Sequence, residues 1–298
     1  MSDKDKAEKI LEDFNDVFAD IFNTLIFKKK FLKEDQLYPS STESICKAAT
    51  ENSLEQRRDI LKMYMENSFQ ILSIGIENQA SQDKYMPIRI MGYDYTAYRE
   101  MISNKRKLIP VITIVLNFTD KKWSNAKSIH ELLKLPDELK DVVSNYHIMV
   151  YDIAYLDDDT IESFTSDFRL IARFFKYKRL GLSADEFFNS EDTVSHIEAF
   201  LDFLTVFTKD TRYRELTYAI KAKTKEGELT KLCYYYDTIE QRGITKGISQ
   251  GISLGIERGR RQAISSLFQS GIITLSQACE QLNISEEEFL SLEPEYQN

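Results

Sequence analysis

Two neighbouring segments with β-strand character constrain the fold of this chain more than any other feature. Residues 58–65 (RDILKMYM) and 69–79 (FQILSIGIENQ) flank the short stretch 66–68 (ENS). Two apolar-rich runs of this length, joined by a few polar residues, are typical of a β-hairpin. The sequence therefore predicts an antiparallel strand pair, and the register of that pair decides which side chains share a face.

The two faces of the second strand differ in character. The even positions Leu72, Ile74 and Ile76 stay apolar along the strand. The odd positions begin apolar and then become small or polar, at Ser73, Gly75, Glu77 and Gln79. A half-buried strand usually alternates evenly between apolar and polar residues. This change therefore indicates that one end of this face packs in the core, whereas the other end carries candidate functional residues.

A turn centred on Ser68 places Asp59 directly opposite Glu77, whereas a slip of one residue would separate them. Opposed side chains have Cβ atoms about 4.5–5.5 Å apart, and two like charges so close are destabilising unless a cation lies between them. Gln79 projects from the same face, and Gly75 leaves room for a substrate. These residues could converge on one divalent ion and one water; the alternative is an ordinary surface hairpin.

The remaining elements predict one small sheet covered by helices. Apolar spacings of three and four predict a helix over 10–25, and a polar, irregular excursion follows over 33–56. Further elements are predicted as a helix over 86–102, strands over 111–118 and 146–156, a helix over 157–179, and helices near 191–208 and 211–222. This order indicates α/β or α+β packing.

A second stripe, made of polar residues, runs along the first helix. Asp13, Asp16, Asp20 and Asn23 recur at spacings of three and four, beside the apolar stripe. Such a stripe is ordinarily a solvated helix face. Its carboxylates could equally overhang a metal site.

The C-terminal part has a different residue pattern from the rest of the chain. The sequence therefore predicts two domains, over 1–225 and 226–298. Glycine recurs every four residues from Gly243 to Gly259 (GITKGISQGISLGIERG), with isoleucine in step. Each glycine in a helix costs about 1 kcal/mol relative to alanine, so close helix packing should offset it. This packing could lie within the protein or in a homodimer, and a frayed linker helix is the alternative. Short helices over 262–269, 276–282 and 285–292 complete a helix-turn-helix-like cap, too acidic to bind DNA.

Composition limits the partners. Of 298 residues, 39 are Lys or Arg and 48 are Asp or Glu, so the formal net charge is −9. This balance argues against a protein that coats nucleic acid through bulk positive charge. It permits local binding of nucleic acid, because the basic residues are clustered. The clusters lie at Lys28–Lys30, Arg57–Arg58, Arg99 with Lys105–Lys107, and Arg169–Arg179. The last cluster could be a solvated helix face or a phosphate-binding face.

Other features place the chain in solution and exclude other chemistry. No apolar run reaches the roughly 20 residues of a membrane span, and the charged N-terminus lacks a signal-peptide core. Three scattered cysteines form neither a disulfide framework nor a zinc pattern. The three histidines are dispersed, and the chain has no serine-hydrolase or P-loop glycine motif. We therefore expect a cytoplasmic protein with no membrane contact.

Several motifs together resemble the Rpn family of recombination-promoting nucleases and putative transposases, in the PD-(D/E)XK nuclease superfamily. The resemblance is carried by NDVFADIFN (15–23), RRD (57–59), GIENQ (75–79), MPIRIMGYD (86–94) and the glycine-repeat tail. It covers nearly the whole chain. It implies a restriction-endonuclease-like αβββαβ core with a helical C-terminal extension, metal-dependent DNA cleavage and a bacterial cytoplasmic setting.

The resemblance also implies roles for individual residues. Asp59 matches the family's metal-binding Asp, and Glu77 matches the acidic residue of the (D/E)XK motif. Gln79 stands where the superfamily usually has Lys and this family often has Gln. Asp16 matches the acidic residue of the first core helix, with Asp20 as its companion. No Pro precedes Asp59, and the Lys is absent, so turnover or activity itself is in question.

The sequence thus predicts an endonuclease that hydrolyses DNA phosphodiester bonds with little sequence specificity and requires Mg²⁺, with Mn²⁺ as a substitute. Asp59, Glu77 and the backbone carbonyl of Asn78 would hold the ion, Gln79 would orient water, and Asp16 would assist. Two alternatives remain. One is a catalytically degenerate nuclease fold that binds DNA or a protein partner. In the other, the glycine-striped tail is the main functional part.

Overall fold

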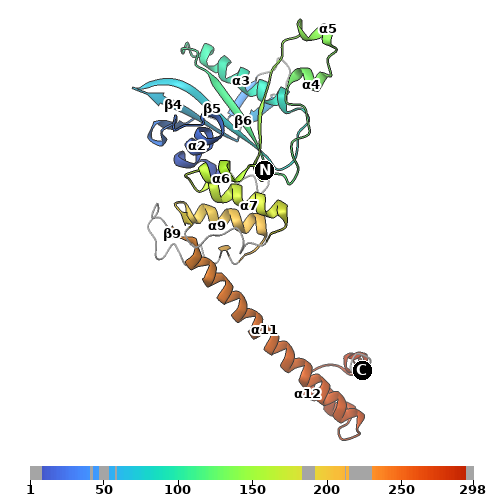
Figure 1. Ribbon diagram of the computed structural model, residues 1–298. Helices are drawn as coiled ribbons and strands as arrows, with labels where there is room; N and C mark the ends of the chain where they lie inside the picture. Colours follow the sequence, from blue (N-terminus) through green and yellow to red (C-terminus); the bar gives the residue numbers. More distant parts are fainter. Residues whose placement is uncertain are drawn as a thin grey trace. The chain divides into compact units, whose positions relative to one another are not determined.

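The computed structural model describes residues 9–40, 43–46, 54–57, 59–182, 192–211, 213–214 and 230–292 (Figure 1). The chain divides into two compact units, Met1–Tyr235 and Tyr236–Asn298. The division falls later than the expected boundary between residues 225 and 226.

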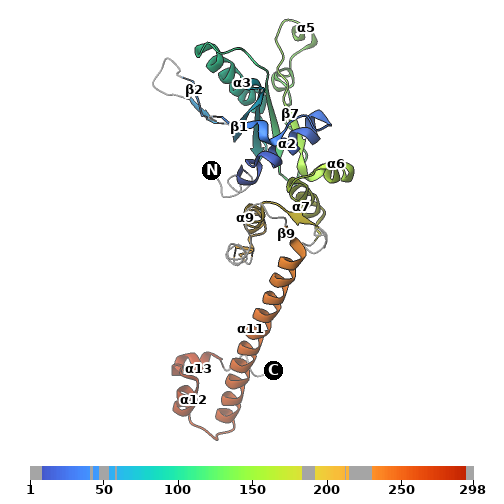
Figure 2. The ribbon, with the colours of Figure 1, turned by 90° about the vertical axis from the view of Figure 1, so that its left-hand side faces the viewer.

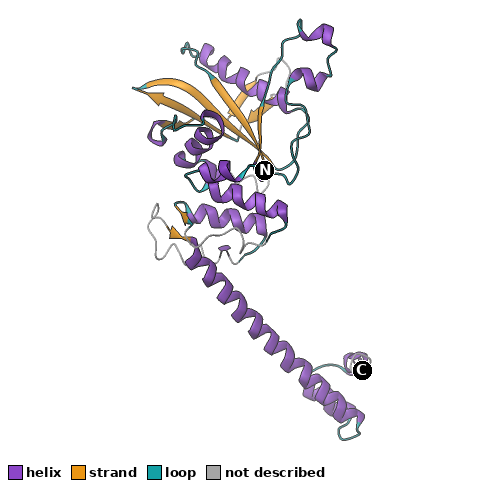
Figure 3. Ribbon diagram, viewed as in Figure 1, coloured by secondary structure: helices purple, strands orange, loops and turns teal. Residues whose placement is uncertain are grey.

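The first unit is built around a five-stranded mixed sheet with the strand order β1-β4-β5-β6-β7. Its strands are β1 (Leu37–Pro39), β4 (Ile60–Glu66), β5 (Phe69–Gln79), β6 (Val111–Asn117) and β7 (Met149–Asp152). The pairs β1–β4 and β4–β5 are antiparallel, whereas β5–β6 and β6–β7 are parallel. Helix α3 (Met86–Ser103) makes the crossover between β5 and β6. The expected mixed α/β architecture is confirmed (Figure 3).

The order of elements in this unit is α2 (Asn15–Phe22), β1, β4, β5, α3 and β6. It follows the αβββαβ order that the family resemblance implies, with the small hairpin β2 (Glu43–Cys46) and β3 (Leu54–Arg57) inserted after β1. The assignment to the restriction-endonuclease-like fold stays a prediction.

The β4–β5 hairpin has the predicted register, but for a different reason. The turn has only two residues, Asn67 and Ser68, both with positive φ (47° and 68°), as a two-residue hairpin turn requires. The pairs nearest the turn, such as Met65 with Gln70, follow from it. Ile71 is then passed over, and pairing resumes with Tyr64 opposite Leu72. This β-bulge shifts the register by one residue.

The two faces of the sheet at β5 are covered by different helices, α2 and α3 (Figure 2). The Asn78 side chain bonds to Glu12, in the helical turn before α2, whereas the Glu77 side chain bonds to Arg89 on α3. Neighbouring residues of a strand point to opposite faces. Helices α2 and α3 therefore cover opposite faces of the sheet.

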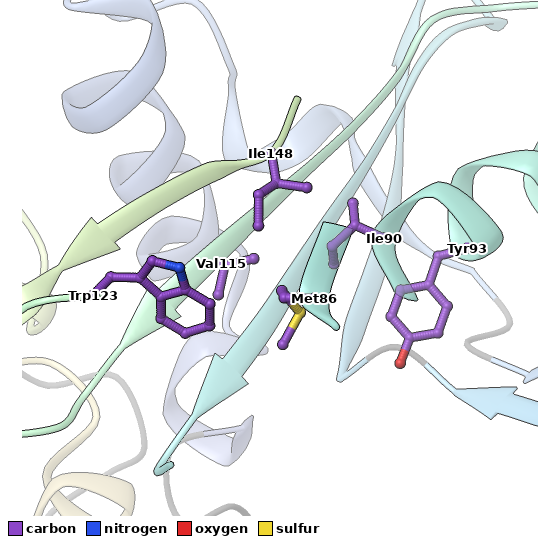
Figure 4. Close-up of a cluster of buried hydrophobic side chains, with 6 residues drawn as sticks. All are labelled: Met86, Ile90, Tyr93, Val115, Trp123 and Ile148. Carbon is purple, nitrogen blue, oxygen red and sulfur yellow. The ribbon is translucent and has the colours of Figure 1, made fainter. Parts of the chain in front are cut away.

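The α3 face of the sheet carries a buried cluster (Figure 4). It consists of Met86, Ile90, Tyr93, Val115, Trp123 and Ile148. Asp94 of α3 ties the helix down, because its carboxylate accepts hydrogen bonds from Thr113 of β6 (2.7 Å) and from Tyr146. The fully buried residues of α2, including Val17, Phe18 and Phe22, form part of the core on the other face.

The helix predicted over 157–179 is interrupted. It forms α6 (Asp158–Ser163) and α7 (Phe168–Leu180), with a turn between them. The buried Asp20 of α2 holds this turn, because its carboxylate accepts hydrogen bonds from the backbone N–H groups of Thr165 and Ser166 (both 2.8 Å) and from both hydroxyl groups. The sequence pattern misses this break because Asp20 is 145 residues away in the chain.

Other boundaries also differ from the sequence prediction. The excursion over 33–56 is not wholly irregular, since it contributes edge strand β1 and the β2–β3 hairpin. The first helix breaks at residues 13–14 and ends in a π-helical turn, Asn23–Phe27. The remaining elements are a 3₁₀ turn (Glu34–Gln36), α4 (Ile129–Leu133), α5 (Asp137–Lys140), a 3₁₀ turn (Ile153–Tyr155), β8 (Thr193–Val194), α9 (Ile197–Thr208) and β9 (Thr230–Lys231). Most of the helix predicted over 211–222 lies outside the described residues.

The second unit consists of most of the long helix α11 (Leu232–Gln269) with α12 (Leu275–Leu282) and α13 (Glu286–Leu292). Buried Ala278, Cys279 and Phe289 form its small core, against which Phe268 of α11 packs. The predicted glycine-bearing helix and small helical cap are therefore present. Among the described helices, none combines the length and apolar character that crossing a bilayer requires.

Replacing Ser68 by glycine should stabilise the first unit. Ser68 has a φ of 68°, where a Cβ atom is unfavourable. Glycine relieves this strain but increases the freedom of the unfolded chain, so we expect a net gain of about 0.5–1 kcal/mol. Urea unfolding of Ser68→Gly measures the gain. Ser68→Ala keeps the Cβ atom and should show none; equal stability of the two variants would contradict the turn assignment.

Candidate active site

Asp59 lies immediately before β4, at the end of the hairpin away from its turn. Its Oδ2 accepts a hydrogen bond from the backbone N–H of Asn78, at 2.7 Å. The same carboxylate forms an ion pair with Lys9. Continued from the pair Ile60–Ile76, the observed register sets Asp59 across from Glu77. The bond to the neighbouring strand thus fixes the carboxylate where the sequence places it.

Glu77 lies on the α3 face of β5 and is buried, with 1% of its surface exposed. Its Oε1 forms an ion pair with Arg89 of α3 and accepts a hydrogen bond from the Gln79 amide at 3.3 Å. Arg89 is held in turn by the Tyr93 hydroxyl and the Asp83 carboxylate, each at 3.1 Å. A fixed cation therefore stands beside Glu77, although no lysine follows it at position 79.

Gln79 and Asn78 complete this end of β5. The Gln79 side-chain amide donates to the backbone carbonyl of Asn78 at 2.8 Å. That carbonyl is the predicted additional metal ligand, and a carbonyl oxygen has two lone pairs. The structure thus brings Asp59, Glu77, Gln79 and the Asn78 carbonyl together at one end of the β4–β5 pair.

Glu12 is a site residue that sequence reasoning missed. It is 1% exposed, and its Oε2 accepts a hydrogen bond from the side-chain amide of Asn78 at 2.6 Å. Glu12 follows the buried Leu11, at the end of the helical turn that breaks at residues 13–14. The predicted polar stripe runs through its neighbour Asp13, because the sequence pattern predicts a continuous helix. Arg89 was also missed, as a single basic residue within MPIRIMGYD.

Three buried side-chain oxygens lack a hydrogen-bond donor among the described residues. They are Oε1 of Glu12, Oε2 of Glu77 and Oδ1 of Asn78. A buried acceptor without a partner is unfavourable, and water or a cation commonly fills such a place. The oxygens of Glu12 and Asn78 lie on the α2 face of the sheet and that of Glu77 lies on the α3 face, and the Asp59 charge acts on both glutamates.

The electrostatics of the site favour an additional cation. Burial, reinforced by the Asp59 charge and partly offset by the hydrogen bond from Asn78, raises the pKa of Glu12 to about 8. Burial and the Asp59 charge raise the pKa of Glu77 to about 8, against the opposing effect of Arg89. Carboxylates with raised pKa values hold protons near neutral pH unless a cation replaces them.

The donor set suits a small, hard cation. Within the described ranges, no three acidic, histidine or cysteine side chains cluster as a ready-made metal centre. Mg²⁺ does not need one, because it commonly takes one or two carboxylates and keeps several waters. Asp59, Glu77 and their unsatisfied neighbours offer oxygen ligands only. The residues therefore fit such an ion, with Arg89 and Lys9 as competing positive charges.

Asp16 is not joined to this group. His196, before α9, places its Nε2 2.9 Å from both Asp16 carboxylate oxygens, and its ring stacks on Phe14 at 3.7 Å. Burial raises the pKa of Asp16, but the hydrogen bond and charge of His196 outweigh burial and lower it. The carboxylate of the predicted companion Asp20 is likewise engaged, because it accepts hydrogen bonds from the turn before α7. The assisting role of Asp16 stays a prediction.

Comparison with known families agrees with the resemblance found in the sequence. The sequence model described as "Putative transposase, YhgA-like" matches residues 61–198. This segment is therefore similar to that family. It contains Glu77, Asn78, Gln79 and Arg89, and it begins two residues after Asp59. Neither a curated protein nor a solved structure matches the chain.

Stability without divalent ions should fall as the pH rises from about 4.5 toward 8. A carboxyl group with a folded pKa of about 8 and an ordinary value of 4.5 holds a proton in the folded state that the unfolded state has lost. The slope is at most about 1.4 kcal/mol per pH unit for each group. Glu12→Gln should flatten this dependence and be the more stable protein at pH 8.

Urea unfolding at several pH values in EDTA measures this difference. Glu138→Gln is the matched control, since Glu138 lies on the exposed helix α5. Parallel pH profiles for Glu12→Gln and the unchanged protein would contradict the buried, cation-seeking state of Glu12.

Proposed function

We propose that this protein is a divalent-metal-dependent DNA endonuclease, with its centre at Asp59 and Glu77. The observation that carries the proposal is the buried Glu77 carboxylate across from Asp59, whose Oε2 has no hydrogen-bond donor among the described residues. The match of residues 61–198 to a putative transposase family supports DNA as the substrate class. Mg²⁺ is the proposed ion, and Mn²⁺ is its proposed substitute.

The proposed roles follow from the chemistry of each side chain. Asp59 and Glu77 would hold the ion, which when bound would polarise the phosphodiester and favour deprotonation of water. The carbonyl of Asn78 would add a neutral ligand. Gln79 would orient the attacking water through its amide, which cannot itself take up a proton at neutral pH.

Arg89 supplies the positive charge that Gln79 cannot. Its guanidinium contacts Glu77 and is held by Tyr93 and Asp83, so it is already ordered beside the carboxylates. Negative charge on the phosphodiester increases during hydrolysis, and a fixed cation stabilises it without reorganisation. We propose that Arg89 contacts the phosphate from its ordered position beside Glu77.

A second candidate function is a non-enzymatic DNA- or protein-binding module. The ion pairs Lys9–Asp59 and Arg89–Glu77 favour it, because each places a cation of the chain against a proposed ligand. The same contacts are compatible with an enzyme, since a divalent ion can displace the partly buried ammonium of Lys9 and guanidinium of Arg89. Cleavage assays separate the two candidates.

Supercoiled plasmid should be nicked in the presence of Mg²⁺ or Mn²⁺ and remain intact in EDTA. Asp59→Asn and Glu77→Gln should each reduce the rate at least about 100-fold, because each removes a charge that holds the ion. Asp137→Asn, on the exposed helix α5, should cleave normally. The measurement is the rate of conversion to nicked circle by the purified proteins.

Asp16→Asn in the same assay tests the predicted assistance from the first helix. Equal activity in Glu77→Gln and the unchanged protein would assign the cleavage to another site or a contaminant. Failure of the folded, unchanged protein to cleave with any metal would favour the binding module.

The isoleucine stripe of α11 supports a homodimer as the second part of the proposal. Ile248 and Ile252 are each 58% exposed, and Ile256 is 67% exposed. A Cβ atom added at Gly247, Gly251, Gly255 or Gly259 would meet no described atom within 4 Å. No close contact within the described chain therefore offsets these glycines. In a homodimer, the isoleucines of each α11 would pack into the spaces that the glycines of the other α11 leave.

Ile252→Asp should shift the protein toward the monomer, since it places a charge in the proposed apolar seam. Gln250→Asp adds the same charge two residues away, which is about 200° around the helix, and should leave the dimer intact. Light scattering coupled to size exclusion reports the mass. A monomeric unchanged protein at tens of micromolar would contradict this part of the proposal.

A further inference from the structure

A cavity lies at the carboxyl ends of the three parallel strands, outside the carboxylate site. It has a volume of about 590 Å³, within the range of about 300–1,000 Å³ that is usual for small-molecule sites. Residues that follow β5, β6 and β7 line it, and α7 and α9 supply its opposite wall. Ligands of open α/β sheets commonly bind at this edge.

Positive charge dominates the polar part of the lining. Lys121, Lys178 and Arg179 line the cavity, and Asp120 is the one acidic residue among its described lining. Arg179 is held in place, because its Nε donates to the Ala154 carbonyl at 2.8 Å and its guanidinium lies 4.4 Å from the Tyr155 ring centre. No carboxylate of the described residues pairs with Arg179. The site therefore offers an ordered guanidinium to an anion.

The apolar part of the lining is aromatic. Phe118, Phe175 and Phe207 line the cavity, and Lys178 lies 5.6 Å from the ring centre of Phe207. The loop after β6 is also fixed, since Gln82 accepts from Ser124 N–H at 2.9 Å and donates to the Lys122 carbonyl at 2.8 Å. Charge and aromatic surface thus meet in a prearranged space that is much larger than a single phosphate ion.

We propose that this cavity binds one unstacked nucleotide, with its phosphate on Arg179 and Lys121 and its base against the phenylalanine wall. Aromatic side chains bind bases of any sequence by stacking, and Arg suits phosphate because its donors form a planar fork. The ligand is either a free nucleotide or a nucleotide of a single strand. Binding does not require that Asp59 and Glu77 cleave DNA.

The position of the cavity relates it to the carboxylate site. Ala80, which lines the cavity, directly follows Gln79 in the chain. The backbone N–H of Phe118, another lining residue, donates to the Gln79 carbonyl at 3.1 Å. A strand with one nucleotide in the cavity would therefore run past the end of β5. The cavity would position a strand with little regard to its sequence.

Binding to the full chain in EDTA tests the proposal without cleavage. Fluorescence anisotropy of a labelled 12-nucleotide single strand gives the dissociation constant, and deoxyadenosine monophosphate and inorganic phosphate serve as competitors. Arg179→Gln should weaken binding at least about tenfold, as expected for loss of a charged hydrogen bond. Ala80→Phe, which fills the cavity from its exposed rim, should weaken it similarly while leaving every charge in place.

Lys127→Gln is the matched control, since Lys127 is exposed on the same unit but does not line the cavity. Competition by the mononucleotide identifies a free nucleotide as a sufficient ligand, whereas binding of the strand alone identifies a nucleotide within a strand. Equal weakening by Lys127→Gln, or unchanged binding in both cavity variants, would overturn the proposal. Competition by phosphate as strong as by the mononucleotide would overturn the base-binding part. Because the readout is binding, an inactive carboxylate site would not affect the result.

Discussion

The register of β4 against β5 is the constraint on which the candidate site depends. A two-residue turn at Asn67 and Ser68 alone would set Asp59 across from Ile76, on the face that α2 covers. The bulge at Ile71 moves the pairing by one residue, and Asp59 then lies across from Glu77. Because side chains alternate between faces, this single extra residue decides whether the two carboxylates meet.

The segment before α2 forms the other wall of the site, and the buried Lys62 attaches it to the sheet. The Lys62 ammonium, with a side chain 3% exposed, bonds to Asn15 Oδ1 at 2.7 Å and to the Asp13 carbonyl, and pairs with the Asp13 carboxylate at 3.2 Å. These contacts satisfy a buried charge, which would otherwise be very unfavourable. They also fix the break at residues 13–14, and Glu12 then reaches Asn78.

The sequence could predict those features of the fold that local residue patterns control. Alternation in 69–79 predicted β5, and the even and odd positions separated the core face from the face of Glu77. Glu12 and Arg89 could not be found in this way, because each meets the site through a contact between segments that are distant in the chain, such as Glu12 with Asn78. The same reason explains why the helix predicted over 157–179 is interrupted in the structure, since the turn between α6 and α7 is held by hydrogen bonds to Asp20 of α2. The register was predicted correctly although its cause, the bulge, was not foreseen.

The charge balance of the site argues that the buried acids serve a ligand. Asp59 pairs with Lys9 and Glu77 pairs with Arg89, Glu12 has no ion pair of its own among the described residues, and two buried carboxylate oxygens have no donor there. A fold that only had to be stable would do better with amides at positions 12 and 77, because an amide avoids the desolvation of a charge. A divalent ion changes this comparison, since it interacts favourably with the same buried charges. The buried acids are therefore consistent with the proposed ion site.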